Sequence, residues 1–235
     1  MFQFVYKMFG SGNAVLPKAG IEAIPKQLVS KLAKTNFVFN SSVSSAIDGK
    51  LVFSNGKEEL VDYTIIATEA SQLVSNLRNQ ETIWKSCDTL YFTTAEKTIQ
   101  KPLIGLLTDA DALVNNIFYH SSMPMAHSGG DNLLSVTIVK PHKLSESELV
   151  KSVQKELTSL CGIKETTFLK RYKIKRALPN LSNIQYDIDP TETRLTSKTF
   201  LAGDQLLNGS LNAAMLSGER AAHAVLQTIN DSIVS

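Results

Sequence analysis

One run of residues near the carboxyl end, residues 200–222, constrains the fold more than any other part of the sequence. It joins a short apolar strand, a corner that contains Gly203 and Asp204, and a long amphipathic helix. The first amides of a helix have no intrahelical partner and carry a partial positive charge, so an anionic or electron-rich ring is stabilised there. The run predicts either a ligand-binding corner, with Asp204 accepting hydrogen bonds from sugar hydroxyls, or an ordinary strand–turn–helix unit in which Asp204 is a turn residue.

The expected helix of this run begins beside Ser210. Serine is a favoured N-cap residue, and Gly209 before it allows the backbone to turn tightly. Eight apolar residues at helical spacing predict a broad face for packing against the rest of the protein: Leu211, Ala214, Met215, Ala221, Ala222, Val225, Leu226 and Ile229.

The first third of the chain has a helical pattern and then an alternating one. Apolar residues at helical spacing predict a helix within residues 19–32. Alternation over residues 36–47 and 50–54 predicts strands, and Asp48-Gly49 between them is typical of a tight hairpin turn. Asn55-Gly56 offers a second hairpin turn. The apolar run at 62–68 is typical of a strand buried on both faces.

The middle of the chain predicts a second sheet. Four runs rich in β-branched and aromatic residues are expected as strands: residues 87–94, 103–107, 114–119 and 133–139. Ser145 and Glu148 form a capping box, which predicts a helix with Leu149, Val153, Leu157 and Leu160 on its apolar stripe. A further strand is expected over 167–174, where basic and apolar residues alternate, so the lysines and arginines there are interpreted as a solvated strand face.

Composition excludes several classes of function. Lysine plus arginine number 24 and aspartate plus glutamate 22, a net charge of +2 that is too balanced for a nucleic-acid groove. The two cysteines are far apart in sequence, and the four histidines lack the spacing of metal ligands, so neither a zinc site nor a disulfide framework is indicated. No run has the length of an integral membrane segment and no secretory leader is evident, so a cytoplasmic location is expected.

The carboxyl-terminal run resembles the flavin motif of the amine oxidase, protoporphyrinogen oxidase and phytoene desaturase superfamily. The residues that carry the resemblance are Ala202-Gly203-Asp204, Gly209-Ser210-Leu211-Asn212 and Ser217-Gly218 with Ala221-Ala222. In that superfamily the aspartate contacts the ribityl or pyrophosphate part of FAD, and the helix start faces the flavin ring. The resemblance therefore implies a role in FAD binding for Gly203, Asp204, Ser210, Leu211 and Asn212. Asn212-Ala213 departs from the usual motif, in which a glycine is common.

A second stretch resembles the same superfamily. Residues 17–21, the strand pair around Val43, the Asn55-Gly56 turn and residues 62–69 follow the superfamily's order and spacing. The resemblance implies that the backbone of Val43 meets the adenine side of FAD. We then expect the first turn after Ser210 to open onto a concave surface bordered by Val43 and Asp204.

The superfamily's dinucleotide-binding unit is missing from the sequence. That unit is a strand, G-x-G-x-x-G, a helix and a later acidic residue. Gly10-Ser11-Gly12 supplies two of the glycines, but Val15 stands at the third and Pro17 follows where the helix should run. The expected protein is therefore the C-terminal part of a flavoprotein, with an N-terminal dinucleotide-binding half missing.

The sequence thus predicts an α+β fold derived from an α/β one, a partial FAD-binding fold with an inserted antiparallel or mixed-sheet substrate domain. Residues 1–70 and 191–235 are expected to form the cofactor part, and residues 71–190 the substrate-binding part. The implied activity is FAD-dependent oxidation of a small hydrophobic substrate: an amine, a porphyrinogen or a polyene. The alternative is a nonenzymatic scaffold or interaction domain that kept the fold.

Catalytic side chains are not identifiable from the sequence, because hydride transfer to a flavin depends mainly on how the substrate is placed. Four aromatic residues of the middle strands are expected either to line a substrate cavity or to pack in the core: Tyr91, Phe92, Phe118 and Tyr119.

Overall fold

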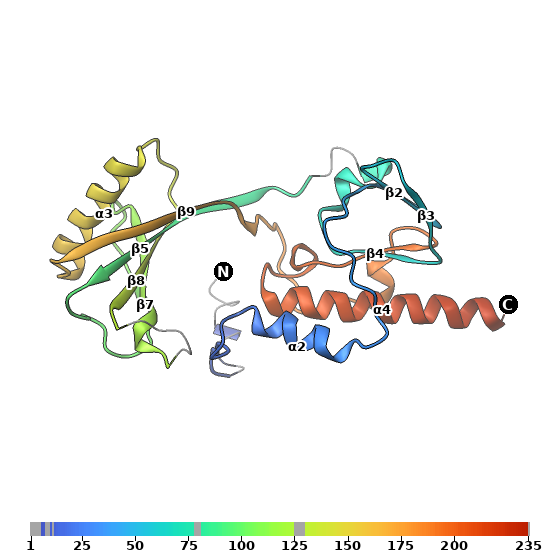
Figure 1. The fold of residues 1–235 in the computed structure, drawn as a ribbon, viewed down its shortest axis with the longest axis horizontal. Helices are drawn as coiled ribbons and strands as arrows, with labels where there is room; N and C mark the ends of the chain where they lie inside the picture. Colours follow the sequence, from blue (N-terminus) through green and yellow to red (C-terminus); the bar gives the residue numbers. More distant parts are fainter. Residues whose placement is uncertain (1–5, 8–9, 11, 78–80, 125–129, 235) are drawn as a thin grey trace. The chain divides into compact units, whose positions relative to one another are not determined.

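The computed structural model describes residues 6–7, 10, 12–77, 81–124 and 130–234. The chain divides into two compact units, each made of two segments (Figure 1). Unit 1 combines Met1–Thr35 with Ser86–Ala177, and unit 2 combines Asn36–Lys85 with Leu178–Ser235. These boundaries follow the contacts within the chain. The expected division into a cofactor part and a substrate part, which concerns ligands, stays a prediction.

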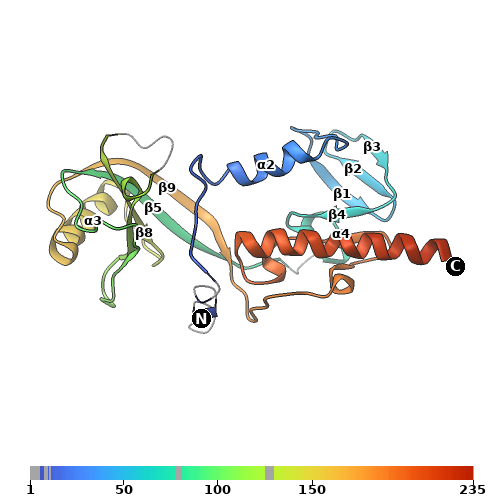
Figure 2. The ribbon, with the colours of Figure 1, turned by 90° about the horizontal axis from the view of Figure 1, so that it is seen from below.

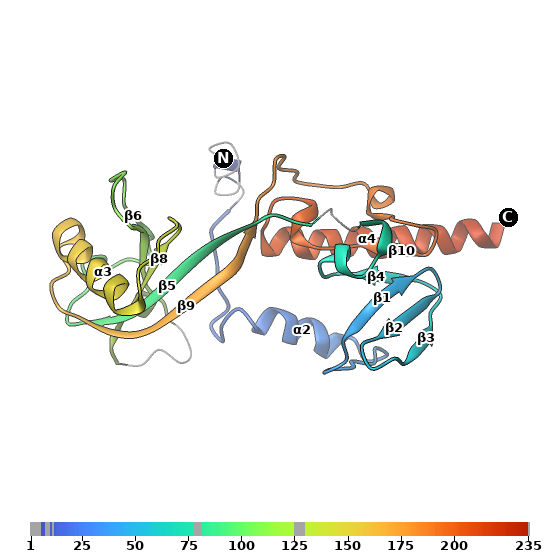
Figure 3. The ribbon, with the colours of Figure 1, turned by 90° about the horizontal axis from the view of Figure 1, so that it is seen from above.

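Unit 1 is built on a five-stranded sheet with the order β6-β7-β8-β5-β9. The long strands β5 and β9 run side by side at one edge (Figure 3). Adjacent pairs β5–β8, β6–β7 and β7–β8 are antiparallel, as expected for a sheet formed by successive strands and turns. The bounds are Trp84–Thr94 for β5, Gly105–Leu106 for β6, Val114–Tyr119 for β7, Asn132–Ile138 for β8 and Thr166–Pro179 for β9. All five predicted strands of this region are present.

Helix α3, Glu146–Cys161, packs on one face of this sheet (Figure 1). Its start is the predicted capping box: the Ser145 side chain accepts a hydrogen bond from the Glu148 amide, and the Glu148 carboxylate accepts one from the Ser145 amide. Leu149, Val153 and Leu157 are fully buried against the sheet. Leu160 was expected on the same stripe but is exposed, because it lies in the last turn of the helix, beyond the buried stripe.

Helix α2, Ala23–Lys31, confirms the helix predicted near the amino terminus. No residue of α2 is buried, and its apolar side is exposed at Leu28 and Val29. The periodicity therefore predicted the helix correctly, although the described residues do not cover its apolar face.

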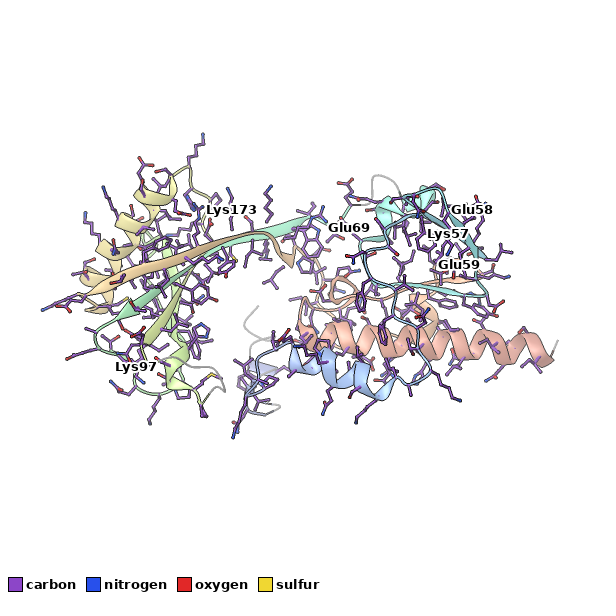
Figure 4. All side chains as sticks on the ribbon, in the orientation of Figure 1. Lys57, Glu58, Glu59, Glu69, Lys97 and Lys173 are labelled. Atoms are coloured by element: carbon purple, nitrogen blue, oxygen red, sulfur yellow. The ribbon has the colours of Figure 1, made fainter. Side chains whose placement is uncertain are left out.

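Unit 2 contains a three-stranded sheet with the order β1-β2-β3 (Figure 2). The strands are β1 Val43–Ile47, β2 Lys50–Phe53 and β3 Glu58–Leu60, joined by the two predicted hairpin turns. Gly49 and Gly56 in those turns have φ values of 81° and 83°, which glycine adopts without steric cost. Lys57 and Glu59 form an exposed ion pair with an N–O distance of 3.2 Å beside the second turn (Figure 4).

A second, parallel sheet of unit 2 has two strands, β4 Thr64–Ile66 and β10 Thr199–Leu201. The expectation that residues 62–68 form a strand buried on both faces is wrong in one respect. Ile66 is buried, but Ile65, whose side chain is on the opposite face of the strand, is 42% exposed. No other part of the described chain covers that face.

The segment at residues 36–39 is a second correction. Its alternating pattern predicted a strand that continues into β1, yet these residues form no strand, and Phe37, Val38 and Phe39 are exposed. The rings of Phe37 and Phe39 stack on each other with centroids 6.4 Å apart. A strand needs a neighbour to bond its backbone, and the described chain supplies none here.

Helix α4, Leu211–Val234, packs on β10 with small residues. Its buried side consists of Ala213, Ser217, Ala221 and Ala224. The predicted apolar stripe was therefore wrong in part, because Leu211, Met215, Ala222 and Leu226 are exposed on another side of the helix. Those four lie at intervals of four, seven and four residues, which is the spacing of a second apolar face.

Short 3-10 helices complete the described structure: η1 Ala70–Gln72, η2 Ser75–Leu77, η3 His120–Ser122, η4 Pro190–Thr193 and η5 Asp204–Leu206. Within the described ranges, no helix combines the length and the apolar character needed to cross a membrane.

Candidate functional site

The predicted corner lies where β10 leads into α4. The Ala202 amide continues the parallel ladder by donating to the Ile66 carbonyl, and the chain then turns at Gly203, whose φ is 144°. The Gly203 amide donates to the Ser217 hydroxyl at 2.8 Å, and that hydroxyl donates to the Ala214 carbonyl at 2.9 Å. Because Ser217 is fully buried, these bonds fix the end of the strand against the helix.

Asp204 follows the turn and uses only its backbone to hold it. Its carbonyl accepts hydrogen bonds from the Leu207 and Gly209 amides at 3.1 and 3.0 Å. Its half-buried carboxylate forms no hydrogen bond or ion pair within the described part of the chain. An aspartate that served only as a turn residue would usually bond a nearby amide through its side chain. The Asp204 carboxylate is therefore available to a ligand.

The start of α4 leaves two backbone donors open. Ser210 is the N-cap, as predicted: its hydroxyl oxygen accepts from the Ala213 amide at 3.1 Å and its hydroxyl hydrogen is donated to Asn208 Oδ1 at 2.6 Å. The Ala214 amide bonds the Ser210 carbonyl. The amides of Leu211 and Asn212 have no partner among the described residues, and both residues are exposed. They give the helix start a donor pair that suits an electron-rich group.

Two glycines shape the corner differently. The space beside Gly203 is occupied by the Gln205 amide, because a Cβ at Gly203 would lie 2.1 Å from Gln205 Oε1. The end of a flexible side chain can rotate away, so this space can open for a ligand. At Gly209, with a φ of 67°, a Cβ would lie 3.2 Å from Pro179 Cδ, so the loop is packed closely.

The structure thus brings five of the six predicted cofactor residues together: Gly203, Asp204, Ser210, Leu211 and Asn212. Val43 lies elsewhere in unit 2, at the start of β1, where it is paired with Phe53. A cavity of 360 Å³ in unit 2 is lined by Asp187, Asp189, Glu192 and Arg220, with Ile188 and Pro190, and contains none of the six. The concave surface expected between Ser210, Val43 and Asp204 stays a prediction.

A polar cluster that the sequence did not reveal joins the hairpin of β1 and β2 to the loop before β10. The Asp48 carboxylate accepts hydrogen bonds from the hydroxyls of Thr196, Ser197 and Thr199, the last two at 2.7 and 2.8 Å. The Thr196 hydroxyl bond is the main reason that the pKa of Asp48 falls to about 2. Asp48-Gly49 was recognised only as a turn, because its partners lie about 150 residues further along the chain.

A buried charged cluster lies in unit 1. The Asp88 carboxylate accepts from Arg171 Nε at 2.7 Å and lies 3.0 Å from His142 Nε2. All three side chains are at least 89% buried. Burial by itself would raise the pKa of Asp88, but the hydrogen bonds from Arg171 and His142 outweigh it and lower the pKa. The cluster ties β5, β9 and the loop before α3 together.

The four aromatic residues predicted either for the core or for a cavity are divided between the two faces of the sheet. Phe92 and Tyr119 are fully buried in the core beneath α3. Tyr91 and Phe118 alternate with them in their strands, lie on the opposite face and are half-buried. There they flank His120, whose ring centroid is 5.7 Å from that of Tyr91 and 5.1 Å from that of Phe118.

A metal site is not evident in the described residues, which contain no group of three His, Cys, Asp or Glu side chains that could hold an ion. Both cysteines are free.

Several solved structures share this fold. A putative protoporphyrinogen oxidase from Exiguobacterium sp. 255-15 aligns with a TM-score of 0.61 and 16% identity, over 93% of this chain and 52% of that one. A redesigned putrescine oxidase aligns with a TM-score of 0.62 and 10% identity, over 88% and 53%. A conjugated-linoleic-acid-producing fatty acid isomerase from P. acnes aligns with a TM-score of 0.61 and 11% identity, over 87% and 52%.

These likenesses establish the fold, and the chain spans about half the length of the structures it matches. No curated protein sequence matches the chain. The family described as flavin containing amine oxidoreductase matches residues 1–226, which include the corner, the hairpins and the five-stranded sheet. The chain therefore belongs to the flavin containing amine oxidoreductase family.

Proposed function

We propose that this chain is the flavin-facing and substrate-facing part of an FAD-dependent oxidoreductase that acts on a small hydrophobic substrate. The observation that carries this proposal is that the same β10–α4 corner holds an unpartnered carboxylate, that of Asp204, and two open amides at the start of α4. An enzyme of this family uses the flavin to accept a hydride, so the protein's task is to bind and orient the two reactants. The substrate class remains an amine, a porphyrinogen or a polyene.

Each residue of the corner has a proposed role. Asp204 accepts a hydrogen bond from a hydroxyl of the ribityl chain, or lies against the pyrophosphate part of FAD. The amides of Leu211 and Asn212 donate to the electron-rich edge of the flavin ring, and Ser210 holds this turn in place through its bond to the Ala213 amide. Val43 is assigned to the adenine side on the resemblance alone.

The uncovered surfaces of unit 2 support a missing N-terminal dinucleotide-binding half. Parallel strands occur almost always in larger sheets covered on both faces, whereas β4 and β10 form a pair with Ile65 exposed. The segment at residues 36–39 has the pattern of a strand but no neighbour, and α4 has a second apolar face. A strand-bearing domain, either earlier in the same polypeptide or on a partner chain, would cover all three.

Flavin titration of the chain tests this proposal. Without the missing half we expect the chain to purify colourless, because most contacts to the adenosine half are absent. Added FAD should still bind weakly and lose fluorescence. Replacing Asp204 by alanine should weaken that binding by about 1–3 kcal/mol, which raises the dissociation constant by roughly fivefold to 150-fold.

The matched control is Asp62→Ala, an exposed aspartate of unit 2 away from the corner, which should bind FAD as the wild type does. Equal FAD affinities for the wild type and Asp204→Ala, or no quenching at the highest FAD concentration, would contradict a flavin site at this corner. Either result would favour the alternative function, a scaffold or interaction domain whose uncovered apolar surfaces bind another protein.

A further inference from the structure

The sheet face of unit 1 that lies opposite α3 combines aromatic rings with one histidine. Phe118, Ser135 and Tyr91 occupy one row across three adjacent strands, because Phe118 and Tyr91 are both in register with Ser135. Tyr172 of β9 extends the row, with its ring 5.8 Å from that of Tyr91 in an edge-to-face arrangement. Helix α3 packs on the other face of the sheet.

His120 follows β7 and is fixed at this row by a hydroxyl relay. The Ser135 hydroxyl donates its hydrogen to the Phe118 carbonyl at 3.3 Å. His120 Nε2 lies 3.0 Å from the same hydroxyl oxygen. Assigning the single hydroxyl hydrogen to the Phe118 carbonyl makes Nε2 the donor in this contact. The other ring nitrogen, Nδ1, then carries the lone pair in the neutral ring.

Two further observations favour a neutral ring with an accessible acceptor. Burial lowers the pKa of His120, which favours the neutral ring. Among the described residues, Nδ1 of His142 is a fully buried atom without a hydrogen-bond partner. Nδ1 of His120 does not belong to this group of buried, unpartnered atoms. Among the residues that the structure describes, none forms a hydrogen bond with His120 Nδ1, so this nitrogen can accept one from a ligand.

We propose that His120 is a substrate-positioning residue, with Nδ1 accepting a hydrogen bond from an N–H or O–H group of a flat apolar molecule stacked among Tyr91, Phe118 and Tyr172. This inference rests on the proposed function, since it names the surface and the chemistry by which unit 1 would hold the substrate. Aromatic rings supply contact area for the apolar body, and the single acceptor Nδ1 selects molecules with a suitable donor.

The test uses the full chain and two probes of nearly the same shape, indole and 1-methylindole, which differ in the N–H donor. Titration followed by NMR should give an indole dissociation constant about fivefold lower than that of 1-methylindole, the effect of one hydrogen bond. His120→Phe should keep the aromatic surface and bring this ratio close to one. His223→Phe, an exposed histidine on α4, should leave the ratio unchanged.

The ¹⁵N chemical shifts of the His120 ring show which nitrogen carries the proton. A histidine with a purely structural role would not need one particular tautomer. The wild type should have the proton on Nε2, and Ser135→Ala should lose this preference. Equal affinities for the two probes in the wild type, no binding of either probe, or a proton on Nδ1 would overturn the proposal. These measurements involve no flavin, so their failure would leave the flavin titration of the Asp204 corner as a separate result.

Discussion

The two units of the chain differ in how completely they enclose their own cores. In unit 1, one cluster of large buried side chains joins the sheet to α3, with Leu90, Phe92 and Leu134 fully buried at its centre. In unit 2, the described core consists of three small clusters, one of which contains Phe200 with three alanines. Burial of apolar area is the main stabilising term in folding, so we expect the core of unit 1 to contribute more stability than the three small clusters of unit 2.

The surfaces of the two units lead to the same distinction. Unit 1 leaves an aromatic and polar sheet face open, which suits a small molecule. Unit 2 leaves apolar side chains exposed at residues 36–39, at Ile65 and along α4. Such surfaces suit contact with another protein domain. The difference fits the proposal that a further domain covers unit 2.

The largest expected effect is in unit 1, where removal of Asp88 would leave Arg171 buried without its partner. Asp88→Ala should lower the free energy of unfolding of this unit by about 3–5 kcal/mol, the usual cost of breaking one side of a buried ion pair. Amide hydrogen exchange of β5 and β8 measures this change. Asp131→Ala, an exposed aspartate of the same unit, is the control and should change stability by less than about 0.5 kcal/mol.

Equal protection from amide exchange in Asp88→Ala and Asp131→Ala would mean that the buried Asp88–Arg171 pair does not stabilise unit 1. If Asp88→Ala lost amide protection only in β9, the cluster of Asp88, Arg171 and His142 would stabilise that edge strand alone.

A smaller, pH-dependent effect is expected in unit 2 from Asp48. Its pKa is about 2 in the folded chain and the ordinary value is 3.8, so its hydrogen bonds stabilise the fold above about pH 4 and are lost as the pH falls toward 2. Asp48 is largely exposed and its bonds are screened by solvent, so we expect a contribution of only about 1 kcal/mol. Asp48→Asn should lower stability at pH 6 and flatten its decline between pH 4 and pH 2.

The chain's single tryptophan, Trp84, is the first residue of β5 and belongs to unit 2, whereas the strand from Ser86 on belongs to unit 1, so the fluorescence of Trp84 during urea unfolding reports this effect. Ser197→Ala removes one of the three hydroxyl donors and should give part of the same change. A pH dependence that is identical in the wild type and Asp48→Asn would mean that the cluster does not stabilise unit 2.

Local sequence signals predicted the elements that depend on a few neighbouring residues. Asp48-Gly49 and Asn55-Gly56 specified both hairpins, and the Ser145 capping box specified the start of α3. The strand–turn–helix corner at Asp204 was also predicted, because a glycine turn and a serine N-cap are local features.

Features that depend on distant partners were not predictable in the same way. His120 meets Ser135 only through the register of β7 on β8, and Asp88 meets Arg171 from 83 residues away. The strand expected at residues 36–39 and the burial expected on both faces of β4 failed for the opposite reason. The alternation at 36–39 is typical of a strand with a neighbouring strand, and the apolar run of β4 is typical of a strand covered on both faces. The described chain supplies neither the neighbouring strand nor the second covering layer.

The smallest expected effect concerns the second apolar face of α4. Leu226 on that face is 56% exposed, so Leu226→Gln should change the free energy of unfolding of this chain by less than about 0.5 kcal/mol. A leucine that packed on the rest of unit 2 would cost several times more to replace. Tryptophan fluorescence during urea unfolding measures the difference, with Ala221→Gln on the fully buried side as the destabilised control. A large loss of stability in Leu226→Gln would mean that this face is already covered within the chain, so that only residues 36–39 and Ile65 would remain for a further domain to cover.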